Sequence, residues 1–157
     1  WYNHKHIQEK KSEKLLNDIL ELMPSLKDLD QLKLIKAIDL VKERATTLVD
    51  LWTLAEYLFF SPKQYNEKAR KKVSLELVKK LIALCEELES RNENKTNLLA
   101  LIKNWSNENN IPLGKVLISI RIIVVGEPSG IDLDKILSFI GFDEFVLRLN
   151  RFVKSAF

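Results

Sequence analysis

Apolar residues recur along most of the chain at steps of three and four, the spacing that places them on one face of a helix. Polar and charged residues fill the positions between them, so each apolar stripe predicts a helix with one buried face. Residues 61–73 show no such period, which indicates a loop containing a short helix. The stripes predict helices over residues 12–23, 30–45, 48–60, 74–88, 96–109, 132–141 and 143–153.

The stretch from Ile111 to Leu133 has a pattern that is compatible with a strand or with a buried helix. Its β-branched residues alternate as in a strand, beginning at Ile118 and running to Val125. A lone strand cannot pair its backbone groups, however, and the rest of the chain offers helical periods. We therefore interpret this stretch as a buried helix and predict an all-α fold.

Residues suited to helix ends support these boundaries. Side chains that can accept a hydrogen bond from a first helical turn precede several stripes, and Pro or Gly follows others. The predicted caps are Ser12, Asp28 or Asp30, Thr46 or Thr47, Ser74 and Thr96, and the predicted stops are Pro24 and Gly141. In the last segment the apolar stripe leaves Arg148, Arg151 and Lys154 on other faces of the helix.

A polar tract from Glu89 to Lys95 interrupts the apolar pattern in the middle of the chain. Such a shift in composition is typical of a boundary between folding units. A second place for a boundary is Ser61 to Gln64, and the tract at 89–95 is preferred. The sequence thus predicts two successive small helical bundles, residues 1–90 and 91–157.

Composition excludes several classes of protein. With 157 residues, 46% of them hydrophobic, the chain can bury a core and is not disordered. No apolar run approaches the roughly 18 residues of a membrane span, and no signal peptide opens the chain, so a cytoplasmic protein without membrane contact is expected. The single cysteine, Cys85, lies among apolar helical positions and is interpreted as a packing residue.

Positive charge is concentrated in one segment. The net charge is only +3, yet residues 63–80 hold seven basic and two acidic side chains. Such a segment can contact a phosphate backbone, with Lys71 and Lys72 as candidates, although a solvated surface is its commoner meaning. Arg121 is different, because it is the one charged residue in the apolar run from Val116 to Val125.

Several motifs together resemble the anticodon-binding end of bacterial glutamyl-tRNA synthetases. In chain order they are Trp1 to Ile7, Arg44 to Leu48, Ala55 to Phe60, Leu113 to Arg121, and Ser129 to Gly141. Their order and spacing over nearly the whole chain carry the resemblance. The first motif follows the catalytic half in these synthetases, and the chain lacks an initiator Met, so a C-terminal piece of a longer protein is expected.

The resemblance implies a partner and a set of contacts. In this family two helical domains receive the anticodon stem and loop of glutamate tRNA, tRNA(Glu). By position, Arg44 would read the third anticodon base, and Arg121 would read the first or second base together with the loop from Glu127 to Leu133. Within that loop the implied contacts are Ser129, Gly130 and Leu133. Ser119 and Ile131 stand where the family commonly has Pro.

Catalytic residues are not expected within this chain. The adenylate-forming motifs of the family are absent, and the four Gly form no phosphate-binding loop. The resemblance implies that ATP, Mg and glutamate bind to a catalytic domain outside these residues, in a monomeric glutamate–tRNA ligase. His4 and His6 are the only histidines and have no third ligand nearby in sequence, so no metal site is expected.

Other interpretations stay open at this point. The apolar stripes also suit a helical protein-interaction module with no RNA ligand, whereas a small helical enzyme would need acid–base or nucleophilic groups that the pattern lacks. Arg44 could form a salt bridge at a helix end. Arg121 could be a structural residue that satisfies helix carbonyls beneath the loop that follows it.

Overall fold

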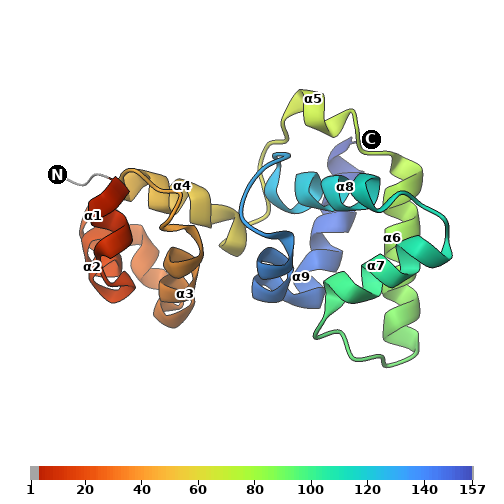
Figure 1. Ribbon diagram of the computed structural model, residues 1–157, viewed down its shortest axis with the longest axis horizontal. Coiled ribbons are helices and arrows are strands. Elements are labelled where there is room, and N and C mark those ends of the chain that lie inside the picture. Colours follow the sequence, from red (N-terminus) through yellow and green to blue (C-terminus); the bar gives the residue numbers. More distant parts are fainter. Residues whose placement is uncertain (1–3, 157) are drawn as a thin grey trace. The chain divides into compact units, whose positions relative to one another are not determined.

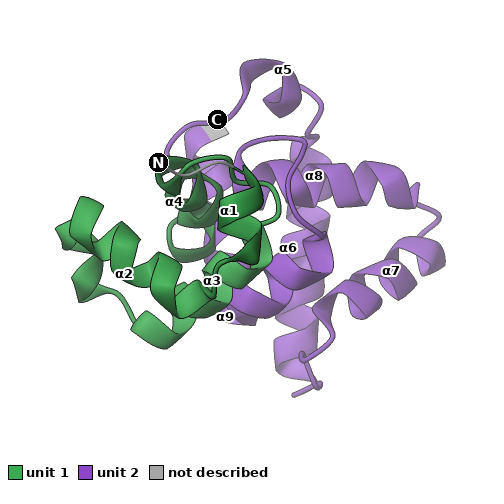
Figure 2. Ribbon diagram, turned by 60° about the vertical axis from the view of Figure 1, so that its left-hand side comes forward, with its two compact units in different colours: residues 1–60 green, residues 61–157 purple. Residues whose placement is uncertain are grey.

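The computed structural model describes residues 4–156 of the chain, and all regular structure within them is helical (Figure 1). The predicted all-α fold is therefore confirmed. The chain divides into two compact units, residues 1–60 and residues 61–157 (Figure 2). The first three residues of the Trp1 to Ile7 motif lie outside the described residues.

The first unit packs its helices around a small apolar core. Its helices are α1 (His4–Glu9), α2 (Ser12–Leu22), the 3₁₀ helix η1 (Pro24–Asp28), α3 (Gln31–Val41) and α4 (Leu48–Phe59). α2 packs against α3, and α4 packs against both. Their buried faces meet through the apolar stripes seen in the sequence, including Leu15, Ile19, Leu34, Ile38, Leu51 and Ala55. Full burial of one such Leu or Ile contributes roughly 1.5–3 kcal/mol.

The second unit is organised around its longest helix. It comprises α5 (Glu67–Arg70), α6 (Leu75–Ser90), α7 (Leu98–Glu108), α8 (Leu113–Val125) and α9 (Leu133–Ala156). α9 packs against α6, α7 and α8 (Figure 1). Buried side chains of α8 include Val116, Ile120, Ile123 and Val124. The interpretation of this β-branched stretch as a buried helix is confirmed.

The divide between the units lies at residue 60 and not at the preferred boundary near residue 90. The physical reason is the position of α6, which precedes residue 90 but packs on α9. Residues 91–157 alone would therefore leave that face of α9 open to water. The polar tract from Glu89 to Lys95 is a connection within one unit, and the observed divide falls beside Ser61 to Gln64, the second predicted place.

Three predicted helix caps are present. The side chain of Asp30 accepts a hydrogen bond from a backbone N–H of α3, 2.9 Å between the atoms. The hydroxyl of Ser74 accepts one from the first turn of α6 at 3.4 Å. Thr47 and Asp50 form a reciprocal capping box at the start of α4.

Two other caps were predicted wrongly. Ser12 lies inside the first turn of α2, and its hydroxyl donates to Asp39 of α3 instead of accepting from its own helix. Asn97, not Thr96, caps α7, because its side-chain oxygen accepts from the backbone N–H of Ala100 at 3.2 Å. The Ser12 prediction failed because its hydroxyl makes a tertiary contact with Asp39. The Thr96 prediction failed because the neighbouring Asn97 supplies the capping oxygen.

α9 is broken at Gly141, where the backbone is non-helical with φ 78° and ψ 172°. A positive φ of this kind favours Gly, which has no Cβ. The predicted helix stop at this residue is confirmed, and the two predicted helices on either side form the two parts of α9.

Within residues 4–156, no helix is long and apolar enough to cross a membrane.

Gly126 ends α8 in the left-handed backbone region, with φ 86°. Its carbonyl accepts a hydrogen bond from the backbone N–H of Asn66, 2.9 Å between the atoms. A Cβ at this position would lie 2.7 Å from the carbonyl oxygen of Gln64 and 3.0 Å from Cβ of Pro62. Gly126 therefore lets the segment around residues 62–66 lie directly against the end of α8.

We expect Gly126→Ala to lower the free energy of unfolding by about 2–4 kcal/mol, since left-handed backbone is costly for Ala and the methyl group meets a backbone atom. Urea denaturation measures the change. Gly114→Ala is the matched control, because nothing lies within 4 Å of a Cβ in the first turn of the same helix. Its effect should range from neutral to a gain of about 1 kcal/mol. Equal losses from both substitutions would contradict the close-approach argument.

Candidate nucleic-acid interface

Arg44 lies in the turn between α3 and α4, with its side chain exposed to solvent. Within residues 4–156 the guanidinium group makes no hydrogen bond and no ion pair, so the salt bridge considered from the sequence is not formed there. All five N–H donors of the side chain are accordingly available to a ligand. That this ligand is the third anticodon base stays a prediction.

The backbone that follows Arg44 is fixed by one carboxylate. Asp50 accepts hydrogen bonds from the backbone N–H groups of Thr46 and Thr47, each at 3.2 Å, and from the hydroxyl of Thr46. The hydrogen bond from the Thr46 side chain is the main reason why the pKa of Asp50 is lowered from its ordinary value. The exposed arginine thus projects from a turn whose exit into α4 has a defined geometry.

Arg121 differs from Arg44 because part of its guanidinium group is already engaged. Its Nη1 atom donates to the carbonyl of Ile131, 2.7 Å away, and the residue is half-buried. Arg121 thus makes a structural contact, but the acceptor is a carbonyl of the loop and not the helix carbonyl considered from the sequence. The bond ties the middle of α8 to the loop that connects α8 with α9, so Arg121 restrains that loop.

The loop residues that follow α8 separate into exposed and packed positions. Ser129 is exposed, Gly130 is half-buried with φ 152°, and Leu133 is buried. Arg121 and Leu133 line one open cavity of about 460 Å³, together with Leu99, Lys103, Gly114, Leu117, Ile118, Asp132 and Asp134. The structure brings Arg121 and Leu133 together here, whereas Ser129 and Gly130 do not line the cavity. Base contacts by these four residues stay predictions.

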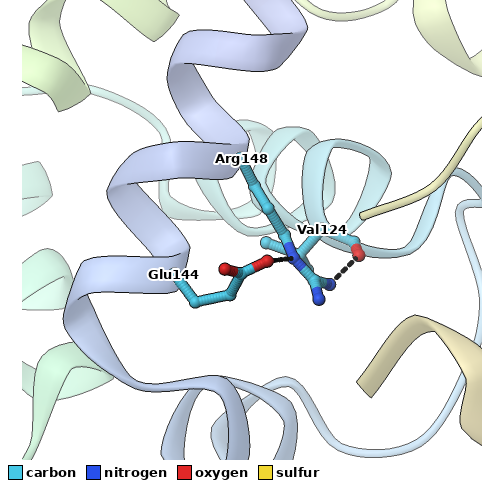
Figure 3. Close-up of polar contacts among 3 residues, drawn as sticks. All are labelled: Val124, Glu144 and Arg148. Atoms are coloured by element: carbon cyan, nitrogen blue, oxygen red, sulfur yellow. Dashed lines mark hydrogen bonds and ion pairs between the residues drawn. The ribbon is translucent and has the colours of Figure 1, made fainter. Parts of the chain in front are cut away.

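Arg148 supports the candidate loop from a buried position that the sequence did not predict. It was placed away from the apolar stripe, yet it is fully buried between Phe145 and Phe152 in the helical order of α9. Its Nε atom donates to Oε1 of Glu144 at 3.0 Å, and its Nη1 atom donates to the carbonyl of Val124 at 2.7 Å (Figure 3). The spacing of 145, 148 and 152 was the signal, because these positions share one helix face.

The Arg148 contacts secure the C-terminal end of α8. Carbonyls in the last turn of a helix lack partners within that helix, and Val124 O belongs to this turn. Burial lowers the pKa of Arg148, while the hydrogen bond that it donates to Glu144 acts in the opposite direction. The guanidinium remains protonated, since arginine does not lose its proton in proteins. A buried cation therefore holds the backbone two residues before Gly126, where the candidate loop begins.

The basic segment contains anchored and unanchored side chains. Arg70 donates to the carbonyl of Ser155 and lies 6.0 Å from the ring centre of Tyr65, so it helps to attach this segment to α9. Lys80 pairs with Glu76 at 2.9 Å. Lys71 and Lys72 are exposed and form no ion pair within the described residues. Their predicted contact with phosphate is untested.

Cys85 has the packing role that its apolar neighbours predicted. It is buried in α6, and burial raises the pKa of its thiol to about 12, which keeps the thiol protonated at neutral pH. In the part of the chain that the structure describes, no group of three or more His, Cys, Asp or Glu side chains lies close enough to hold a metal ion.

The two compact units together match a single family model. Residues 14–153 match the model described as an anticodon binding domain, so the chain belongs to this family. Among curated relatives, glutamate–tRNA ligase of Flavobacterium psychrophilum is 32% identical over 96% of this chain and 30% of its own length. The corresponding ligase of Porphyromonas gingivalis is also 32% identical, over 98% of this chain and 31% of its own length.

A solved structure agrees with these relatives. The crystal structure of a glutamate tRNA ligase from Elizabethkingia meningosepticum, in complex with its amino acid, superimposes with a TM-score of 0.82 and 26% identity. The match covers 99% of this chain and 31% of that ligase. The chain thus spans about a third of the length of the ligases that it resembles, and the resemblance noted from its motifs is confirmed.

Because Arg148 supplies a buried helix end with a donor, we expect Arg148→Met to lower the free energy of unfolding by about 2–4 kcal/mol. Met fills much of the same volume but leaves the Val124 carbonyl and Glu144 without this partner. Thermal and urea denaturation measure the change. Arg151→Met, at an exposed position of the same helix, is the control and should stay within about 0.5 kcal/mol of the unchanged chain. Similar stabilities of the two variants would count against the capping role.

Proposed function

We propose that this chain recognises the anticodon stem-loop of tRNA(Glu) as the C-terminal part of a glutamate–tRNA ligase. The observation that carries the proposal is the family match, which extends from residue 14 to residue 153 and so covers most of both compact units. The remainder of the ligase would bind ATP, Mg and glutamate in a catalytic domain. We also propose that the whole protein acts as a cytoplasmic monomer.

Arg44 is the proposed reader of the third anticodon base. Bases in single-stranded loops are recognised by hydrogen bonds to their edges, and the arginine fork can donate two parallel bonds to a base that offers two acceptors. The exposed guanidinium with its uncommitted donors supports this role. An amide or ammonium side chain could not reproduce the planar fork.

Arg121 is proposed to act together with the loop from Glu127 to Leu133 on the first or second base. One of its five donors holds Ile131 O, which leaves others for a base in the open cavity beside it. Ser129 and Gly130 would contribute hydroxyl and backbone contacts from the loop, and Leu133 would contribute an apolar surface. Lys71 and Lys72 would contact the phosphate backbone.

We expect Arg44→Gln to reduce selection against a changed third anticodon base by roughly 1–3 kcal/mol, the value of one good bidentate base contact. The measurement is the ratio of dissociation constants for two stem-loop RNAs that differ only at this base. Arg44→Lys should lose most of the same selection, because it keeps the charge but not the fork.

Lys36→Gln is the matched control for Arg44→Gln, since it removes one positive charge from an exposed position on the neighbouring helix α3. It should weaken both RNAs equally or not at all. Loss of affinity for both RNAs by the same factor in Arg44→Gln would make Arg44 a phosphate contact. If the unchanged chain bound neither RNA, a protein-interaction module would become the better explanation.

We expect Lys71→Ala and Lys72→Ala to weaken all tRNA stem-loops alike and to flatten the dependence of affinity on salt. Each lost phosphate contact should reduce the slope of log affinity against log salt by about 0.7–0.9, because fewer counterions are released on binding. Titrations at several salt concentrations measure the slope. Lys27→Ala, which removes an exposed charge outside the basic segment, is the comparison. Slopes that stay unchanged in both segment variants would assign these lysines to a solvated surface.

A further inference from the structure

Helix α1 contacts the backbone on both sides of Arg44. The Nδ1 atom of His4 lies 2.8 Å from the carbonyl oxygen of Ala45, and the side-chain nitrogen of Gln8 donates to the carbonyl of Glu43 at 3.3 Å. These carbonyls belong to the residues immediately before and after Arg44. The contacts connect positions 41 and 35 residues apart in sequence, so they are tertiary and not part of the local turn.

A single arrangement of protons satisfies this group of contacts. A carbonyl can only accept, so the ring of His4 must carry its proton on Nδ1 to donate to Ala45 O. Its Nε2 atom is then an acceptor, and the side-chain nitrogen of Gln8 lies 2.9 Å away as the donor. The two N–H groups of the Gln8 amide thus serve the His4 ring and Glu43 O. His4 and Gln8 form one connected unit that holds two carbonyls.

The rest of the turn explains why these two carbonyls matter. The backbone N–H of Arg44 donates to Val41 O at 2.9 Å, and the side chain of Ala45 is fully buried. Asp50 accepts from the N–H groups of Thr46 and Thr47, and the first of these belongs to the peptide group that carries the Ala45 carbonyl. Without His4 and Gln8, the carbonyl of Glu43 would lose its side-chain donor, and the Ala45–Thr46 peptide group would be held by a side chain only at its N–H, through Asp50.

We infer that His4 and Gln8 are positioning residues for Arg44, which fix the turn so that the exposed guanidinium meets the third anticodon base in one orientation. The inference rests on the proposed reading of that base by Arg44. A long side chain loses less freedom on binding when its backbone is already ordered, so fixing the turn favours the specific contact. Neither residue needs to touch RNA to have this effect.

The test is a double-mutant cycle on third-base preference, defined as the ratio of dissociation constants of the chain for two anticodon stem-loops that differ only at that base. His4→Ala and Gln8→Ala should each lower the preference about fivefold, the effect of losing one net hydrogen bond. In an Arg44→Gln background the same changes should leave the preference unaltered, because the group they position is gone. His4→Asn should restore most of the preference, since its amide can donate to Ala45 O from the position of Nδ1.

Asn17→Ala is the matched control, because it removes an exposed amide from α2 in the same unit. The third-base preference of Asn17→Ala should equal that of the unchanged chain. Thermal denaturation checks that each variant is folded. Gln8 is exposed, so Gln8→Ala keeps the test valid if His4→Ala does not fold. Undiminished preference in folded His4→Ala or Gln8→Ala, or equal losses with and without Arg44, would overturn the positioning role. Absence of any preference in the unchanged chain would overturn the proposed function itself, a distinct result.

Discussion

The hydrogen bond from Arg148 to the carbonyl of Val124 is the constraint on which the candidate loop depends. A helix end exposes carbonyls that must find partners elsewhere, and in the second unit a fully buried guanidinium supplies one. Two residues later the chain turns at Gly126, whose carbonyl accepts a hydrogen bond from the backbone N–H of Asn66. Arg121 then holds Ile131 O from below. These carbonyls are thereby fixed from three different segments, and residues 127–129 of the loop between them are exposed to solvent.

In the first unit, smaller side chains supply donors to unpaired backbone carbonyls. The turn after α3 also presents carbonyls that the helix cannot satisfy, and His4 and Gln8 of α1 supply the donors. Asp50 then satisfies the N–H groups at the start of α4. In both units the exposed candidate residue lies between restrained backbone groups. The entropy cost of ordering the backbone is then met during folding, so it does not weaken the binding of a ligand.

The sequence predicted the fold well where periodicity and end signals agreed. The stripes and their boundaries gave the main helices, and the argument that a lone strand cannot exist correctly assigned the β-branched stretch to α8. The short α1 was not predicted, and the divide at residue 60 falls beside Ser61 to Gln64, the second choice and not the preferred boundary. The polar tract at 89–95 shows why, because a loop within a unit and a linker between units have the same composition. Only the packing of α6 on α9 distinguishes them.

The candidate site was less predictable than the fold, because its support comes from tertiary hydrogen bonds. Arg148 was assigned to a polar face, although its spacing from Phe145 and Phe152 placed it on the buried one. That assignment followed the charge of Arg148 and neglected its helical spacing. Nothing in the local sequence around His4 indicates a contact with Ala45, which lies 41 residues away. Periodicity identifies which face is buried, but it cannot identify which distant carbonyl a polar side chain will reach.

The two candidate arginines differ in how many of their donors the fold already uses. Arg44 has no partner for its guanidinium within the described residues, whereas Arg121 commits one donor to Ile131 O. The bond restrains one edge of the Arg121 guanidinium and leaves further N–H groups that can face the neighbouring cavity. A planar group that is held at one edge loses less freedom when its other edge binds a base. Anchoring Arg121 to the loop would therefore favour the proposed base contact as well as stabilise the fold.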